Sequence, residues 1–242
     1  MDLPVPELLK RLTHEPLKAH GFLANASNHT MLVSVGRVTD GVAGVYKPES
    51  GERPLWDYPD GSLARREAAA YVVDSLLGWE IVPPTVYREE GPRGPGSVQM
   101  FVPHNPAIHY FTLVEDSAHH SALARVALFD LLVNNGDRKG SHIMRADNGH
   151  LWACDHGLTF HAEPKLRTVI WELGGRPVPV DDRSQLAGLA QALTDGGQDE
   201  ALAAFLDQSE IDSLAERAGI LADLRKLPEI QPDYRPYPWP PL

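Results

Sequence analysis

The clearest hydrophobic pattern in the amino-terminal half lies between residues 63 and 77. Apolar residues recur there at intervals of three, four and seven, which places them on one face of an α-helix: Leu63, Ala70, Val73, Leu76 and Leu77. Ser62 comes directly before them and belongs to the residue types that cap helices. We therefore predict a helix from about Leu63 to Leu77, capped by Ser62, with Glu67 near its apolar face.

Shorter apolar runs predict β-strands on both sides of this helix. Residues 31–35 and 42–48 flank a glycine-bounded turn and predict a hairpin, and residues 81–87 and 97–102 flank a glycine-rich turn and predict a second one. The prolines near the start of residues 81–87 are typical of an edge strand. A short helix over residues 5–12 precedes these strands and ends before a proline.

The carboxyl-terminal half has mainly helical spacing. Residues 121–133 are strongly apolar and predict a buried helix, and residues 184–227 alternate apolar and acidic residues at helical intervals. A polar loop and two short strands, over residues 134–154, lie between them. The prediction is an α+β fold with two lobes: a sheet-rich lobe with one main helix over residues 1–104, and a mainly helical lobe over residues 105–227.

Composition and charge restrict the possible partners. The chain of 242 residues has 22 Lys+Arg against 33 Asp+Glu, a net charge of −11. Because binding to phosphate backbones needs clustered cations, we expect no nucleic-acid partner. No apolar run reaches the length of a membrane span, and residues 1–12 lack the apolar core of a signal peptide, so we expect a cytoplasmic protein. The proline-rich residues 228–242 predict an extended tail that could dock on a partner.

Four charged residues, far apart along the chain, have the order that phosphoryl transfer from a nucleotide requires. Such transfer needs a cation on the phosphates, a carboxylate that holds this cation, an aspartate near the attacking hydroxyl and another aspartate on the metal. Lys47 at the end of a predicted strand, Glu67 in the predicted helix, and Asp137 and Asp155 in loops supply these groups. Taken alone, each residue is more often a solvated side chain or part of a tight turn. Their shared order favours the phosphotransfer interpretation.

The sequence around these residues resembles the phosphatidylinositol 3-/4-kinases, most closely their type II 4-kinase branch, and more distantly the HipA-type protein kinases. Five segments between residues 23 and 160 carry the resemblance in the family's order: Val45–Pro48, Glu67–Asp74, Ser97–Val102, Phe129–Arg138 and Asp155–Leu158. The resemblance implies a protein-kinase-like bilobal fold, in a small bacterial, actinobacterial-type member, with ATP and Mg²⁺ or Mn²⁺ as cofactors.

The resemblance also implies a role for each matching residue in the first lobe. Lys47 would contact the nucleotide phosphates and act in catalysis, and Glu67 would position Lys47. Backbone groups at Phe101 and Val102 would hold the adenine ring at the hinge between the lobes.

In the second lobe the resemblance assigns Asp137 to the proton of the acceptor hydroxyl and Asp155 to the metal ion. Two departures stand out. His142 replaces the asparagine that serves this family as second metal ligand, and metal ligand, phosphate contact and inert replacement are all open roles for it. The loop expected to cover the phosphates has no glycine, so that Ser27 and Asn28 would offer side-chain donors to the nucleotide instead.

The leading functional hypothesis is an ATP-dependent kinase that phosphorylates a hydroxyl of a small polyol, an inositol-type compound or a protein. A lipid acceptor fits less well, because the chain has no basic amphipathic segment and its net charge of −11 is repelled by an anionic bilayer. The alternative is a nucleotide-binding pseudokinase that regulates a partner protein, favoured by His142 and the glycine-free loop. A scaffold that docks through its tail explains only residues 228–242.

Overall fold

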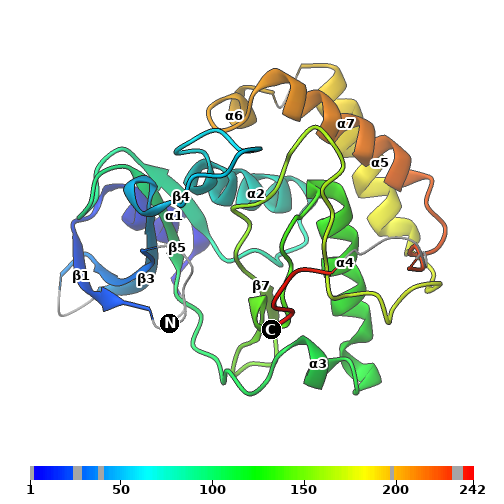
Figure 1. Cartoon of the computed structure of the whole chain (residues 1–242), viewed down its shortest axis with the longest axis horizontal. Helices are drawn as coiled ribbons and strands as arrows, with labels where there is room; N and C mark the ends of the chain where they lie inside the picture. Colours follow the sequence, from blue (N-terminus) through cyan, green and yellow to red (C-terminus); the bar gives the residue numbers. More distant parts are fainter. Residues whose placement is uncertain (1–2, 24–28, 38–40, 197–198, 231–236) are drawn as a thin grey trace.

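The structure is a computed structural model that describes the chain except for residues 1–2, 24–28, 38–40, 197–198 and 231–236. A sheet-rich lobe and a mainly helical lobe lie side by side (Figure 1). This arrangement confirms the predicted α+β fold with an antiparallel sheet in the first lobe and a mostly helical second lobe.

The first lobe is built on a five-stranded antiparallel sheet in the order β1-β2-β3-β5-β4. Two helices pack on this sheet, since both contact β4 and β5. The elements are α1 (Val5–His14), β1 (Leu17–Phe22), β2 (Met31–Val35), β3 (Val42–Pro48), the short 3₁₀ helix η1 (Glu49–Gly51), α2 (Leu63–Leu77), β4 (Thr85–Arg88) and β5 (Gly96–Met100).

The alternation of side-chain directions along β3 decides on which face of the sheet Lys47 lies. Its residue Tyr46 is fully buried in a core shared with Leu8 and Leu12 of α1. Because successive side chains of a strand point to opposite faces, Lys47 lies on the other face of the sheet. That face is the one next to Glu67 of α2, which Lys47 contacts.

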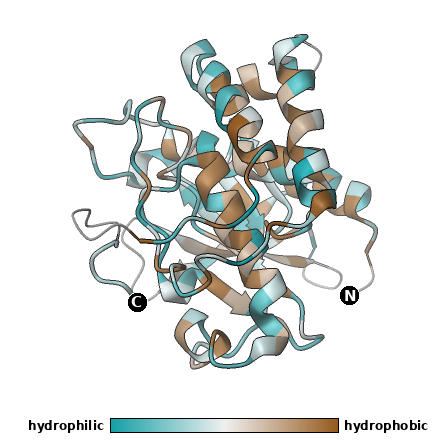
Figure 2. Ribbon diagram, turned by 90° about the vertical axis from the view of Figure 1, so that its right-hand side faces the viewer, coloured by the Kyte–Doolittle hydropathy of each residue, from teal (hydrophilic) through white to brown (hydrophobic). Residues whose placement is uncertain are grey.

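The second lobe surrounds a large apolar core in which α4, α5 and α7 meet, and Figure 2 shows apolar residues gathered where the helices face one another. A two-stranded antiparallel sheet of β6 and β7 carries the loops of the site. The elements are α3 (Tyr110–Leu113), η2 (Ser117–His119), α4 (His120–Val133), η3 (Gly140–His142), β6 (Ile143–Arg145), β7 (Leu151–Ala153), α5 (Val180–Thr194), α6 (Asp199–Ala203) and α7 (Gln208–Ala222).

Most predicted elements lie close to where the sequence placed them. The helix over residues 63–77 has the predicted ends, and the helix over residues 121–133 begins one residue earlier. Strand β1 was not predicted, because its sequence LKAHGF is largely exposed and has no alternating apolar pattern. Residues 184–227 form most of α5 and all of α6 and α7. In the first lobe, α1 is a second helix that packs on the sheet.

The predicted cap of α2 is wrong. The hydroxyl of Ser62 donates to the carbonyl of Pro59 and makes no capping bond. The carboxylate of Glu52 accepts the backbone N–H groups of Leu63 and Ala64 instead, at 3.2 and 2.8 Å. An acidic group at this end of a helix is favoured by the helix dipole, so a loop residue eleven positions away replaces the local cap.

Within the described part of the chain, no helix combines the length and the apolar character that crossing a membrane requires.

The end of α2 is joined to the following loop by a buried carboxylate. Asp74 is almost fully buried, and its Oδ2 accepts the backbone N–H groups of Ile81 and Val82 at 3.0 and 2.9 Å. Its Oδ1 has no hydrogen-bond partner among the described residues. Burial raises the pKa of Asp74 from 3.8 to about 7, although the two N–H groups oppose this shift.

We predict that Asp74→Asn changes how stability depends on pH. Because the folded state holds a proton on Asp74 more tightly than the unfolded state, the parent protein loses stability as pH rises from about 4 to 7, by about 1.4 kcal/mol per unit of pKa shift. Asparagine keeps the Oδ acceptor and does not titrate. The free energy of unfolding, measured by urea titration, should therefore shift in favour of the variant. The difference between variant and parent should be a few kcal/mol larger at pH 8 than at pH 4. A constant difference across this range would contradict the prediction.

Candidate active site

A lysine held between two carboxylates forms the centre of the candidate site. The Nζ of Lys47 forms an ion pair with Oε1 of Glu67 and a second one with Oδ1 of Asp155, at 2.9 Å. The sequence-predicted residues from β3, α2 and the loop after β7 are thus brought together, although Lys47 and Asp155 are 108 positions apart.

Local backbone structure aims Asp155 at Lys47. Asp155 follows β7 and has a left-handed backbone, with φ of 62°, a region that aspartate tolerates better than most residues. The next backbone N–H, that of His156, donates to Oε2 of Glu67 at 3.0 Å. One carboxylate of α2 therefore holds both Lys47 and the loop that carries Asp155.

Lys47 and Asp155 keep each other ionised. Burial opposes ionisation of Asp155, but the positive charge of Lys47 outweighs burial and holds the pKa of Asp155 well below its usual range. Burial likewise acts to lower the pKa of Lys47, and Asp155 and Glu67 raise it above its ordinary value. The side chain of Asp155 is 43% exposed, so an ionised oxygen remains accessible to a ligand.

The loop that follows α4 is anchored by a buried ion pair. The guanidinium of Arg138 is fully buried and donates to both oxygens of Asp130 at 3.0 and 3.1 Å. It also donates to the carbonyl of Cys154 and to Nε2 of His156. The side chain of Asn135 donates to Asp130 at 3.0 Å as well. These contacts fix residues 134–138 against the loop that carries Asp155.

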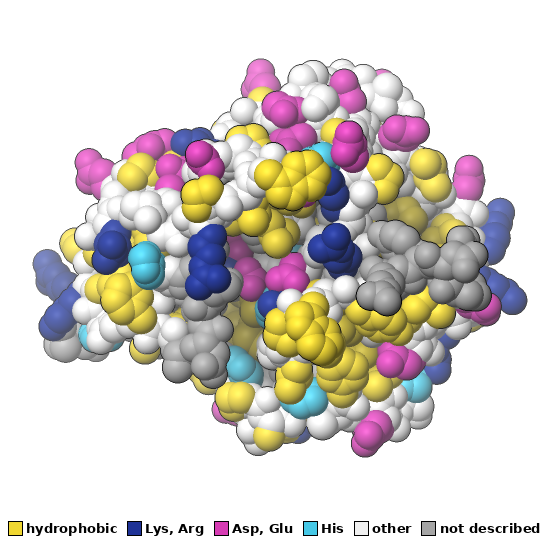
Figure 3. Space-filling model, viewed as in Figure 1, with side chains coloured by type: hydrophobic (Ala, Val, Ile, Leu, Met, Phe, Trp, Pro, Cys, Tyr) yellow, Lys and Arg dark blue, Asp and Glu magenta, His cyan; other side chains and the backbone are white. Residues whose placement is uncertain are grey.

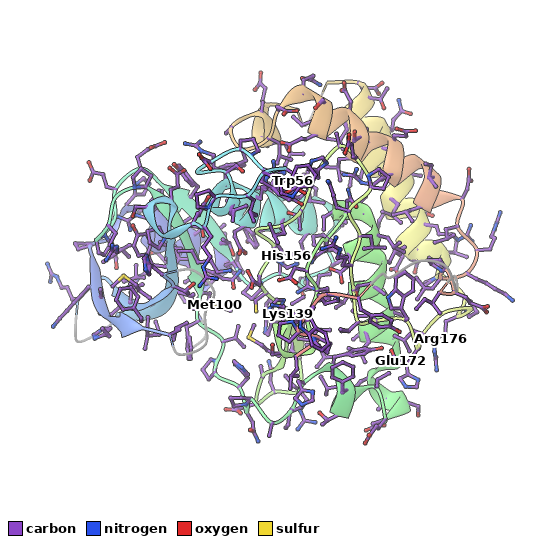
Figure 4. The ribbon with its side chains drawn as sticks, viewed as in Figure 1. Trp56, Met100, Lys139, His156, Glu172 and Arg176 are labelled. Carbon is purple, nitrogen blue, oxygen red and sulfur yellow. The ribbon has the colours of Figure 1, made fainter. Side chains whose placement is uncertain are left out.

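Asp137 projects from this anchored loop and keeps access to solvent. Its backbone N–H donates to Oδ1 of Asn135, and its Oδ2 lies 3.3 Å from Nζ of Lys139. Burial raises the pKa of Asp137, with a further contribution from Asp155, while Lys139 opposes this shift. A carboxylate with a raised pKa is a better proton acceptor, which suits the predicted role near a hydroxyl. Figure 4 shows Lys139 and His156 between the two lobes.

His142 lies within the site, next to Asp155. Its Nδ1 accepts the backbone N–H of Lys139 at 3.3 Å, which places the ring proton on Nε2, 3.3 Å from Oδ2 of Asp155. Burial lowers the pKa of His142 from 6.5 to about 4, so the ring is neutral at pH 7. With its proton on Nε2, the imidazole lies beside Asp155 and directs no ring lone pair toward that carboxylate.

The predicted hinge groups are partly engaged within the protein. The backbone N–H of Phe101 donates to the carbonyl of Ala43 at 3.0 Å, and the carbonyl of Val102 accepts from Nδ1 of His104 at 2.8 Å. The other predicted nucleotide contacts, Ser27 and Asn28, lie outside the described residues.

Comparisons with known proteins agree with this geometry. Residues 65–202, more than half of the chain, match the family profile described as phosphatidylinositol 3- and 4-kinase. The chain belongs to this family. It is 39% identical, over an alignment of 253 residues, to Protein Rv2133c of Mycobacterium tuberculosis, which covers 91% of this chain and 90% of that protein.

One solved structure has a similar fold, and a second is more distant. The structure of hydra Fam20 with sugar superposes with a TM-score of 0.58 at 15% identity, covering 92% of this chain and 88% of that one. The Helicobacter pylori proinflammatory kinase CtkA gives a TM-score of 0.47 at 10% identity, covering 88% and 94%. The similarity to Fam20 places this phosphatidylinositol 3- and 4-kinase family member in the kinase-like fold class that the sequence predicted.

Sequence reasoning missed the buried charged residues that anchor the site. Arg66, next to Glu67, is almost fully buried, forms an ion pair with Glu210 of α7 and donates to the carbonyl of Thr159 at 2.6 Å. Asp130 lies within the most apolar predicted helix. A charged residue at a buried helix position needs a partner, and this was the available signal for Asp130 and Arg66.

We predict that Arg138→Leu lowers the free energy of unfolding by about 3–5 kcal/mol, because it leaves the buried carboxylate of Asp130 without its cation. Chemical denaturation measures this loss. The double variant Arg138→Leu with Asp130→Leu should lose less than the single variant, since no buried charge is then unpaired. The exposed Arg225→Leu serves as control and should change stability by no more than about 0.5 kcal/mol. A double variant that is less stable than the single one would contradict this account.

Proposed function

We propose that this protein transfers the γ-phosphoryl group of ATP to a hydroxyl of a small polyol, an inositol-type compound or a protein. One observation carries the proposal. Lys47 contacts both Glu67 and Asp155, and these three residues come from three different parts of the chain. This is the grouping that places a cation on nucleotide phosphates beside a carboxylate able to bind a metal.

The residues fit a divalent metal that is held jointly with a nucleotide. Asp155 offers an ionised, partly exposed oxygen, which is the kind of ligand that Mg²⁺ prefers. The described residues contain no cluster of three or more His, Cys, Asp or Glu side chains that could bind a metal by themselves. Mg²⁺ usually keeps few protein ligands and completes its shell with phosphates and water, and when bound here it would neutralise phosphate charge.

The chain's own groups then have distinct tasks. Lys47 holds phosphate oxygens while Glu67 keeps its ammonium group in place. Asp137 orients the acceptor hydroxyl and accepts its proton as the new oxygen–phosphorus bond forms and the bond to ADP breaks. His142, neutral and protonated on Nε2, can donate to a phosphate oxygen, and it would become a metal ligand only if that proton moved.

The second candidate function is a nucleotide-binding pseudokinase that regulates a partner protein. One observation favours it: the residue in the place of the second metal ligand is His142, whose Nε2 lies 3.3 Å from Oδ2 of Asp155 and whose Nδ1 accepts from the backbone of Lys139. Such a protein would bind ATP with Lys47 and Asp155 and transfer nothing. Both functions share the nucleotide site, so binding and transfer must be measured separately.

We predict opposite effects for two aspartates. Asp155→Ala should abolish the rise in melting temperature that ATP produces only with Mg²⁺ or Mn²⁺, because ligand binding to the native state stabilises it. Asp137→Asn should retain that rise and lower the rate of ³²P transfer from ATP by about 10²–10⁴-fold, as expected for a lost proton acceptor. The exposed turn residue Asp147, changed to Asn, is the matched control and should leave both measurements unchanged.

The outcomes separate the two candidates. A metal-dependent thermal shift without ³²P transfer to any acceptor, or to the protein itself, would support the pseudokinase. If Asp137→Asn transfers phosphate at the parent rate, Asp137 has been given the wrong role.

A further inference from the structure

Residues 237–242, which we call the tail segment, lie against the loop that carries Asp137. The backbone N–H of Gly140 donates to the carbonyl of Pro241 at 2.8 Å. Gly140 comes three positions after Asp137 and is the first residue of η3. Figure 1 shows this end of the chain close to β7, the strand that leads to Asp155. The described part of the proline-rich tail is therefore bound by the second lobe, next to the candidate site.

The contact at Gly140 leaves no room for a side chain. A Cβ atom at this position would lie 2.8 Å from the ring of Phe111 of α3 and 3.2 Å from Cδ1 of Leu242. Gly140 is buried, and a buried backbone N–H needs a hydrogen-bond partner, which the carbonyl of Pro241 supplies. Glycine here lets the Asp137 loop, α3 and the tail segment approach one another closely.

The other end of the tail segment is anchored separately. Pro238 is buried. Burial raises the pKa of Tyr237, and the charge of Glu172 adds to this shift, so the phenol lies near a carboxylate that accepts the hydroxyl of Tyr110 of α3. Between the two anchored ends, the side chain of Trp239 is 89% exposed. Figure 3 shows apolar side chains gathered at the middle of this face, next to acidic side chains between the lobes.

The residues next to Gly140 make contacts with both aspartates of the site. Lys139 precedes Gly140, and its Nζ lies 3.3 Å from Oδ2 of Asp137. His142 ends η3, and its Nε2 lies 3.3 Å from Oδ2 of Asp155. The carbonyl of His142 also accepts the N–H of the residue before Asp155, at 2.9 Å. A displacement of Gly140 would therefore disturb the surroundings of both aspartates.

We propose that the tail segment holds the Asp137 loop in its working position, so that Pro241 and Leu242 are positioning residues for phosphoryl transfer. The proposal rests on the proposed phosphotransfer. Misplacing a reacting group by about 1 Å can lower a rate about 100-fold, so a contact that fixes Gly140 controls the rate without touching ATP. The ion pairs of Lys47 are formed by other elements, and nucleotide binding therefore does not depend on the tail segment.

Hydrogen exchange in the full chain tests whether the tail segment holds the loop. The double variant Pro238→Ser with Leu242→Ser removes apolar contacts at both anchored ends, and Trp239→Ser makes the same change at the exposed position as matched control. In the double variant the amide hydrogen of Gly140, followed by NMR, should exchange about tenfold faster than in the parent. Trp239→Ser should keep the parent rate. The amide of Phe129, inside α4, is the reference and should be unchanged in both variants, which shows that the release is local.

Kinetics test the positioning role. The rate of ³²P transfer from ATP to myo-inositol or to the protein itself is measured with Mg²⁺ or Mn²⁺. The double variant should lower kcat by about 10–100-fold and leave KM for ATP within about twofold of the parent, because the loop moves and the nucleotide contacts remain. Trp239→Ser should leave both constants unchanged.

A rescue experiment covers the case in which the double variant does not fold. The chain shortened to residues 1–236 should lose transfer to a similar extent. Adding a peptide of residues 237–242, Tyr-Pro-Trp-Pro-Pro-Leu, should raise its kcat about tenfold or more, and a peptide of the same composition in scrambled order should not. A shortened chain that keeps the parent kcat would refute the proposal.

Other results would also overturn it. The proposal fails if Gly140 exchanges at the same rate in the parent and in the double variant, or if Trp239→Ser has the effects of the double variant. A higher kcat after release would make the tail segment an inhibitor. A higher KM for ATP with unchanged kcat would mean that the tail segment contacts the nucleotide.

Failure of the phosphotransfer is recognised separately, by a parent protein that transfers ³²P neither to an added acceptor nor to itself. Exchange at Gly140 does not depend on transfer and still decides whether the tail segment holds the loop. Faster exchange in the double variant supports this contact, and equal exchange refutes it.

Discussion

The ion pair between Arg138 and Asp130 is the interaction on which the candidate site depends. Both side chains are completely buried, so each charge would be strongly destabilised without the other. The guanidinium also reaches the carbonyl of Cys154 and the ring of His156, and Asp130 receives Asn135. One buried pair therefore fixes the loop of Asp137 and the loop of Asp155 to the end of α4. The position of the two aspartates relative to each other follows from this anchor.

A second constraint joins the lobes through two neighbouring residues of α2. Glu67 holds Lys47 of the first lobe and the N–H of His156 of the second. Arg66 pairs with Glu210 and donates to the carbonyl of Thr159. Glu210 in turn forms the capping box of α7 together with Asp207. Because Arg66 and Glu67 both bind the second lobe, α2 is fixed to that lobe at the point where it contacts Lys47. The site is preorganised by contacts that come mostly from α7 and from the loop after β7.

The parts that the sequence predicted are those that local pattern controls. The helix over residues 63–77 follows from its periodicity, and Lys47, Glu67 and Asp155 follow from the order of family motifs, although the contact between Lys47 and Asp155 became visible only in three dimensions. The parts that were wrong or missing depend on distant residues. Glu52 replaces Ser62 as the cap of α2 because a loop folds back over the helix end. The tautomer of His142 depends on which ring nitrogen accepts from the backbone N–H of Lys139, and no spacing in the sequence indicates this.

The contacts around Asp155 also relate metal binding to nucleotide binding. Its two oxygens lie close to two nitrogens, Nζ of Lys47 at 2.9 Å and Nε2 of His142 at 3.3 Å, so a metal ion bound to Asp155 would lie beside the ammonium group of Lys47. Displacing Lys47 alone would leave an ammonium group beside a divalent cation, which is unfavourable at short range in a partly buried site. Phosphate oxygens remove this conflict, because they accept from Lys47 and bind the metal at once. A metal ion and a nucleotide bound together at this site would therefore favour each other's binding, because Lys47 is shared between Glu67 and Asp155.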